Sequence, residues 1–363
     1  MHRPRTGRPA PAPLDELLCL GFRGVMPELG GAPRRTGAGA ALCGRVRLGA
    51  GAILHAYSVI RGDGHDVDVG TDFHLGERST VHIAHEQYPA IVGHEVTVGR
   101  NAVVHACRIG DRCVLEDNTA VLDGAVVGAG SVLTAGSIVY PRAELPAGHL
   151  CRGSPAVAFR RLEPGELMLM RGRVRNASAG GQADAEVAID APAATAGFAP
   201  AEALGWVAPT AQVEGRLALA PDASVWFGCA LDGGPRGILV GAGSNIQDNT
   251  VIYAMSSPVK IGAGVTVGHN VSLQDCEIGD FSLIGMASFV APGTVIEADV
   301  LLAAGSSTQP RQVLEGGWLW GGRPARRIAP MTDERRQLIR SVARIYCEYA
   351  VEFARSVGAG LAD

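Results

Sequence analysis

The sequence contains almost no lysine, few aromatic residues and no long apolar run. Only Lys260 among its 32 basic residues is a lysine, and 36 acidic residues oppose them, so a nucleic-acid-binding surface is not expected. No apolar stretch approaches the ~20 residues of a membrane span, and Leu14–Leu20 is too short and acidic for a cleaved signal peptide. Eight scattered cysteines without a CxxC pair indicate reduced thiols. We therefore expect a cytoplasmic protein with no membrane partner.

Glycine is abundant, and an aliphatic residue recurs at every sixth position over long stretches. The chain has 49 glycines among 363 residues. A period of six is neither the 3.6 of a helix nor the 2 of an ordinary strand. It predicts a short strand and a corner, with three such units in a coil of about 18 residues, stacked as a parallel β-helix. One block of the first half carries the series Ile109, Leu115, Val121, Val127, Leu133 and Val139.

The two halves of the chain match each other. Val81-His82 aligns with Ile252-Tyr253 at an offset of 171, and Val98-Gly-Arg100 aligns with Val267-Gly-His269 at an offset of 169. The sequence therefore predicts an all-β solenoid of two tandem β-helix domains with a C-terminal α-helix that packs along them. The expected segments are an extension with a short helix (1–35), the first β-helix (36–162), a helical stub and flexible linker (163–203), the second β-helix (204–330) and the C-terminal helix (331–363).

The histidines fall into the register of the repeat. His82 and His105 each follow an inward aliphatic residue, so both should point outward. Their separation is one coil plus a loop of five residues, which places one imidazole above the other, where the two can share a metal ion. The position of Arg100 in the first copy corresponds to His269 in the second. That position lies on another face of the prism, so its side chain can join the pair only from a neighbouring prism.

These motifs resemble the γ-class carbonic anhydrases and their homologues over most of both copies. The resemblance rests on the RGD-like turn at Arg61, on the blocks around His82 and His105, and on the closing Gly-Ser-Pro-Ala motif. It implies a trimer of left-handed β-helices that binds zinc between adjacent subunits, with two His from one subunit and the third from its neighbour. A homo-oligomer formed by side-by-side packing is therefore expected.

Neither copy carries all three of the family's histidines. The first copy offers His82 and His105 with Arg100 at the middle position, whereas the second offers His269 with Tyr253 and Gln274 at the other two. Pairing the first copy with the second gives His82, His105 and His269. Other family positions divide in the same way. Arg61 and Asp63 are found only in the first copy, and Asn245, Gln247 and Asp248 only in the second, where the first has His74, Gly76 and Glu77.

The resemblance implies a carbonate dehydratase-like zinc lyase that hydrates CO2 reversibly with a zinc-bound hydroxide. In this interpretation Gln247 hydrogen-bonds the bound water, Arg61 pairs with Asp63 or Asp248, and His85 is the proton shuttle. Iron or cobalt could replace zinc, and the substrate would be CO2 or bicarbonate.

Two other classes of function stay open at this point. One is a metal-free assembly scaffold, and the other is a hexapeptide-repeat acyltransferase that uses acyl-CoA. The sequence leaves undecided whether the two copies meet within one chain or between chains, and how many chains assemble.

Overall fold

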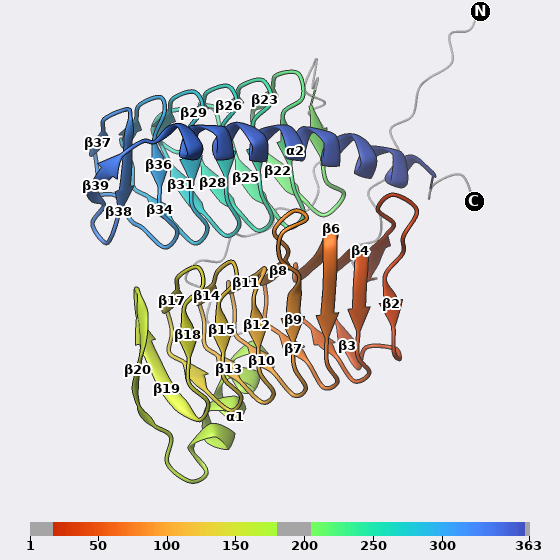
Figure 1. Cartoon of the computed structure of the whole chain (residues 1–363). Helices are drawn as coiled ribbons and strands as arrows, with labels where there is room; N and C mark the ends of the chain where they lie inside the picture. Colours follow the sequence, from red (N-terminus) through yellow and green to blue (C-terminus); the bar gives the residue numbers. More distant parts are fainter. Residues whose placement is uncertain (1–16, 180–204, 360–363) are drawn as a thin grey trace, which may run out of the picture.

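The computed structural model describes residues 17–179 and 205–359 as two left-handed parallel β-helices and two α-helices (Figure 1). The first solenoid extends from β1 to β20 and the second from β21 to β39. The two solenoids lie side by side, and successive coils advance in the same direction in both (Figure 1). No helix in the described part of the chain is long and apolar enough to cross a membrane. The two solenoids confirm the predicted β-helix fold. The domain boundaries given above remain a prediction.

The first solenoid is built from a twelve-stranded and an eight-stranded sheet. The twelve-stranded sheet bends around a corner of the prism and contains β1 (Leu18–Leu20), β2 (Glu28–Leu29), β4 (Ala41–Leu48), β6 (Val59–Val69), β8 (Thr80–His82), β9 (Ala90–Val92), β11 (Val103–His105), β12 (Arg108–Ile109), β14 (Ala120–Val121), β15 (Val126–Val127), β17 (Ile138–Val139) and β18 (Glu144–Leu145). The eight-stranded sheet contains β3 (Arg35–Thr36), β5 (Ile53–Leu54), β7 (His74–Leu75), β10 (Thr97–Val98), β13 (Val114–Leu115), β16 (Val132–Leu133), β19 (His149–Gly153) and β20 (Ala156–Arg161).

The second solenoid has three sheets, one for each face. The first contains β21 (Trp206–Val207), β24 (Ser224–Val225), β27 (Asn245–Ile246), β30 (Thr266–Val267), β33 (Leu283–Ile284), β36 (Leu301–Leu302), β38 (Trp318–Gly321) and β39 (Arg326–Pro330). The second contains β22 (Gln212–Glu214), β25 (Ala230–Asp232), β28 (Val251–Tyr253), β31 (Ser272–Gln274) and β34 (Phe289–Val290). The third contains β23 (Leu217–Leu219), β26 (Ile238–Val240), β29 (Val259–Ile261), β32 (Glu277–Ile278), β35 (Val295–Ile296) and β37 (Val313–Leu314).

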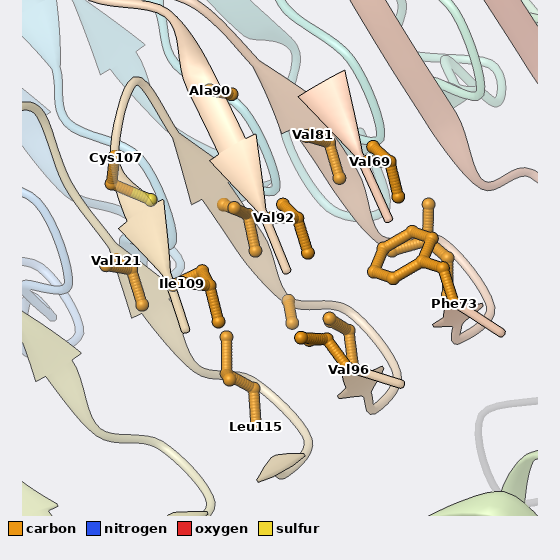
Figure 2. Packing of buried hydrophobic residues seen from close by; sticks show 14 of the residues in the cluster. Val69, Phe73, Val81, Ala90, Val92, Val96, Cys107, Ile109, Leu115 and Val121 are labelled. Atoms are coloured by element: carbon orange, nitrogen blue, oxygen red, sulfur yellow. The ribbon is translucent and has the colours of Figure 1, made fainter. Parts of the chain in front are cut away.

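The hexad aliphatic residues form the core of each solenoid. Val81, Val104 and Val121 are fully buried and lie above one another in successive coils, and Figure 2 shows the stacked side chains inside the first solenoid. Stacked coils approach closely at the corners. A Cβ atom on Gly76 would overlap the carbonyl group of Gly99 in the next coil, so only glycine fits there. The period of six therefore supplies both the buried side chains and the tight corners.

The helices differ in length and in what they cover. Helix α1 (Glu166–Ala179) packs on Val114, Val132 and Leu150 of the first solenoid. Helix α2 (Asp333–Ala359) contacts four strands of the second solenoid and also β1 of the first. The C-terminal helix predicted within 331–363 is observed. Most of its apolar stripe packs against the solenoids (Val342, Ile345, Tyr349 and Phe353), whereas Leu338 is exposed.

The described part of the N-terminal segment is a sheet extension. Residues 17–35 contain β1 and β2 and no helix, because Leu18–Leu20 pair with Ala41–Cys43 of β4 and extend the sheet by one coil. Residues 1–16, most of the predicted linker, and the last residues of the chain lie outside the described residues.

An aromatic cluster joins the two solenoids to α2. It contains Phe22 of the first solenoid, Trp226 and Phe227 of the second, and Tyr346, Tyr349 and Phe353 of α2. All six side chains are buried. Because the cluster draws on three separate parts of the chain, it fixes the two solenoids relative to each other and places the buried groups described next.

Candidate metal centre

Three imidazoles meet in the interface between the solenoids. His82 ends β8 and His105 ends β11, and the two residues are paired in register across these adjacent strands. His269 comes from the turn after β30 of the second solenoid. Its Nε2 lies 3.1 Å from Nδ1 of His82, and Nε2 of His105 lies 3.3 Å from the same atom. The three residues that the sequence paired across the two copies are thus brought together within one chain.

The outer nitrogen of each imidazole faces a carboxylate. Nε2 of His82 lies 2.8 Å from Asp63, Nδ1 of His105 lies 2.6 Å from Asp123, and Nδ1 of His269 lies 3.1 Å from Asp248. A carboxylate that is hydrogen-bonded in this position holds the ring proton on the outer nitrogen. His82 and His105 make such hydrogen bonds, whereas Nδ1 of His269 lies at ion-pair distance from Asp248 without forming one. The inner nitrogens of His82 and His105 then direct lone pairs at each other, which is unfavourable unless a cation lies between them.

Burial keeps two of these imidazoles neutral at neutral pH. Desolvation, reinforced by the Arg61 guanidinium, lowers the pKa of His82 to about 3. Desolvation also lowers the pKa of His269 to about 4, against the opposing effect of Asp248. Neutral imidazole is the form that binds metal ions, so neither ring has to lose a proton before it can serve as a ligand at pH 7.

A buried ion cluster beside the imidazoles carries excess negative charge. The guanidinium of Arg61 contacts Asp63, and its Nε donates to Asp248 Oδ2 across the interface at 2.9 Å. All three side chains are completely buried. Trp226 lies under the guanidinium, with its ring centroid 4.3 Å from the Cζ atom of Arg61. Two carboxylates against one guanidinium leave one negative charge, and Asp123 adds another, so a divalent cation among the imidazoles would neutralise the site.

The residues fit a first-row metal ion. In tetrahedral coordination with metal–nitrogen bonds of about 2.0–2.1 Å, two ligand nitrogens are separated by about 3.3 Å. The 3.1 and 3.3 Å separations observed here are close to that value. Within residues 17–179 and 205–359, these histidines are the one cluster of three or more His, Cys, Asp or Glu side chains found close enough together to share an ion. Three imidazoles suit zinc, iron or cobalt alike.

The other predicted site residues lie at different depths. Arg61 is at the centre of the ion cluster and pairs with both partners named from the sequence. His85 is partly exposed and its Nδ1 contacts the hydroxyl of Tyr349 on α2. Gln247 is buried and its amide donates to Asn245 at 3.1 Å. The structure therefore connects Arg61 directly to two of the imidazoles through their carboxylates, whereas the functions assigned to His85 and Gln247 stay predictions.

Sequence reasoning missed Asp123, Tyr346 and Tyr349 as site residues. Asp123 lies 18 residues after His105 and follows Leu122, the residue one coil beyond His105, so the register pointed only to its neighbour. The tyrosines had no such signal. Tyr346 accepts a hydrogen bond from Arg61 at 3.3 Å, but its helix is distant in sequence and was interpreted only as a packing element.

The positions that correspond to these histidines in the opposite copy of the repeat do not form a second metal centre among the described residues. Arg100 is exposed and its guanidinium binds Asp117 at 2.7 Å. Tyr253 and Gln274 are paired in register on the second solenoid and are half-buried. Each copy thus lacks the histidines that the other retains, as predicted from the sequence. One set of three histidines forms, at the interface between the first and the second solenoid.

Position 74 of the first solenoid holds a buried histidine where the second has Asn245. Neither ring nitrogen of His74 has a hydrogen-bond partner among the described residues, and burial, with His55 and Arg175 nearby, lowers its pKa to about 3. The unfolded chain takes up a proton here near pH 6.5 and the folded chain does not. We therefore expect His74 to lower the free energy of unfolding by about 2 kcal/mol at pH 5 relative to pH 7.5.

The test of this pH effect is the substitution His74→Asn, which installs the residue of the second copy. Urea unfolding at pH 7.5 and pH 5 should show a smaller loss of stability in the variant than in the wild-type protein. The same exchange at an exposed histidine, His94→Asn, is the matched control, and the pH dependence of His74→Asn is compared with that of this variant. An equal loss in wild type and His74→Asn would contradict the prediction.

Comparisons with known proteins agree with the hexapeptide-repeat fold and with the family resemblance. A family model for the hexapeptide repeat of succinyl-transferase matches residues 89–122. The chain is 36% identical over 152 residues to gamma carbonic anhydrase 2, mitochondrial, of Arabidopsis thaliana, a match that covers 40% of this chain and 55% of that protein. It is 30% identical over 148 residues to the carbonic anhydrase of Geobacillus kaustophilus, covering 40% of this chain and 80% of that protein. The chain thus spans about half the length of the mitochondrial relative.

A solved structure extends the likeness to both solenoids. The putative acetyltransferase from Desulfovibrio desulfuricans G20 matches 90% of this chain and 81% of its own, with a TM-score of 0.55 and 17% sequence identity, which is a likeness of fold. Fold and site together define a tandem hexapeptide-repeat β-helix protein with a three-histidine cluster between its halves. The chain belongs to the γ-carbonic anhydrase-like family of hexapeptide-repeat proteins.

Proposed function

We propose that this protein is a metal-dependent enzyme that hydrates CO2 reversibly, at a single composite site between its two solenoids. The observation that carries the proposal is the set of three inner imidazole nitrogens whose outer nitrogens all face carboxylates. The net negative charge of the buried ion cluster and the relatives named carbonic anhydrase give further support. Zinc is the metal we expect, because three neutral imidazoles with an open fourth position are typical of catalytic zinc.

The residues of the chain would act as follows. His82, His105 and His269 would hold the ion, which when bound supplies the Lewis acidity that lets water ionise near neutral pH. Asp63 and Asp123 would keep the ring protons of His82 and His105 on the outer nitrogens, and Asp248 faces the outer nitrogen of His269. Arg61 positions two of these carboxylates at once. It therefore ties the His82 ligand of one solenoid to the His269 ligand of the other.

Proton transfer and substrate binding would involve residues at the edge of the interface. The side chain of His85 is 27% exposed, so its Nε2 can exchange a proton with buffer while Nδ1 is held by Tyr349. Leu122 lies one coil beyond His105 and packs in one apolar cluster with Met286, which lies one coil beyond His269. Apolar side chains one coil away from the imidazoles suit a small uncharged substrate such as CO2. They provide no hydrogen-bonding groups for a large polar substrate.

The direct test is CO2 hydration by the purified protein reconstituted with zinc, iron or cobalt, measured by stopped flow with a pH indicator. We expect metal-dependent activity that a chelator abolishes. Fully metal-loaded protein without hydratase activity would refute the proposal. Assembled protein that binds no metal would indicate a scaffold instead, and acetyl-CoA binding independent of metal would indicate an acyltransferase.

Asp123→Asn tests the contribution of a carboxylate outside the ligand set. The amide cannot hold the His105 ring proton as a carboxylate does, so we expect metal affinity to fall about 10–100-fold. Activity should return at saturating metal. Competition with a chromogenic chelator measures the affinity, and Asp117→Asn on the exposed pair with Arg100 is the matched control. Equal affinity of Asp123→Asn and wild type would contradict the assigned function of Asp123.

A further inference from the structure

The last coil of each solenoid forms a basic surface that we call the basic end. It comprises residues 140–163 of the first solenoid and 309–330 of the second, and it lies at the same end of both (Figure 1). These residues include eight arginines and three glutamates, whereas the rest of the sequence has 24 basic and 33 acidic residues. All eight arginines are exposed; they are Arg142, Arg152, Arg160, Arg161, Arg311, Arg323, Arg326 and Arg327. A chain with a net charge of −4 thus concentrates positive charge at one end.

Part of this charge is uncompensated. Arg160 pairs with Glu166, and Arg327 pairs with Glu315. Arg161 and Arg326 have no carboxylate within ion-pair distance among the residues that the structure describes. They lie on β20 and β39, the antiparallel edge strands that close the two solenoids. The outermost strand of each solenoid therefore presents a free guanidinium.

Exposed apolar side chains lie among these arginines. Val157 and Phe159 on β20 are 59% and 51% exposed, and Ile328 on β39 is 60% exposed. Phe159 and Ile328 occupy equivalent positions in the two copies, at an offset of 169. The Cζ atom of Arg152 lies 3.5 Å from the centroid of the Phe159 ring. The same combination of an apolar side chain and flanking arginines therefore occurs twice on one end of the molecule.

We infer that the basic end binds the surface of an anionic phospholipid bilayer. Arginines near such a surface contribute about 1 kcal/mol each by pairing with lipid headgroups, and isolated apolar side chains insert at the headgroup boundary beside them. Because both solenoids present their end coils at the same side, both can contact one planar surface. Stacking of two copies through this end is disfavoured by like charge. From the sequence, no membrane partner was expected, because no apolar stretch could span a bilayer. Binding through the basic end differs from that expectation, since it needs no spanning segment.

The test is sedimentation of the metal-loaded full chain with vesicles of phosphatidylcholine alone or mixed with phosphatidylglycerol. We expect binding only to the mixed vesicles, weakened by salt. Arg161→Glu with Arg326→Glu should lower the affinity about 10–100-fold. Arg112→Glu with Arg236→Glu changes the net charge equally at exposed positions away from the basic end, and should have little effect. Phe159→Ser with Ile328→Ser should also weaken binding.

Three results would overturn the inference. The first is that wild-type protein does not sediment with mixed vesicles at low salt. The second is that the control pair weakens binding as much as the Arg161 and Arg326 pair does. The third is that soluble polyglutamate binds with the same affinity while the Phe159 and Ile328 pair changes nothing, which would indicate an acidic polypeptide partner. Circular dichroism and retained metal content of each variant show that it is folded, and hydratase activity is not part of the readout.

Discussion

His269→Ala should empty the metal centre, although this histidine is 187 residues from His82 in the sequence. The substitution removes one of three inner nitrogens and leaves the buried carboxylate of Asp248 without its imidazole. Loss of a partner outside the ligand set already lowers metal affinity about 10–100-fold, so loss of a ligand should lower it by more than about 100-fold. Metal content after gel filtration, measured by inductively coupled plasma mass spectrometry, should fall from one ion per chain to nearly none.

The control for His269→Ala is an exposed histidine, and His94→Ala should keep its full metal content. His82→Ala should match His269→Ala, because both nitrogens belong to the same set. Full metal content in His269→Ala with loss in His82→Ala would show that the first solenoid binds the ion with its own residues. That outcome would contradict the composite site and leave the β-helix fold unaffected.

Arg61→Met is expected to lower the free energy of unfolding by about 3–5 kcal/mol in the metal-free protein. Arg61 is completely buried and bridges Asp63 to Asp248 across the interface. Its removal leaves two buried carboxylates next to each other with no cation between them. Burial by itself would raise the pKa of Asp63, but the charge of Arg61, with help from His82, holds it well below its ordinary value. Urea unfolding followed by tryptophan fluorescence measures the change.

A second substitution separates charge from packing in this result. Asp248→Asn added to Arg61→Met removes one of the two stranded negative charges, so the double variant should be more stable than Arg61→Met alone. Arg112→Met at an exposed position is the control and should change stability by less than about 0.5 kcal/mol. If Arg61→Met loses less than 1 kcal/mol, or if the second substitution brings no recovery, the ion cluster is not what stabilises the interface.

Much of the fold was predictable because its signals are local. A hexad position such as Val81 or Val104 has its environment set by residues one coil away, and each coil repeats the same geometry. The register therefore also predicted that His82 and His105 stack on one face, whereas Asp123 lies one residue past the position that stacks on His105 and was not found by this argument. The C-terminal helix was predictable from its apolar stripe. The short helix expected within residues 1–35 stays a prediction, because residues 1–16 lie outside the described residues, while Leu18–Leu20 pair with β4.

The amino-acid order by itself determined the coil and the stacking of two imidazoles, and it placed His269 where it can join them only from another prism. Only the tertiary structure decided that the prism lies in the same chain. Contact between the solenoids depends on Arg61 meeting Asp248 and on aromatic side chains of α2 meeting Phe22 and Trp226. These pairs are separated by more than a hundred residues and follow no period. The physical reason is that repetition encodes the neighbours within a coil stack, whereas docking of two stacks depends on side chains that occur once.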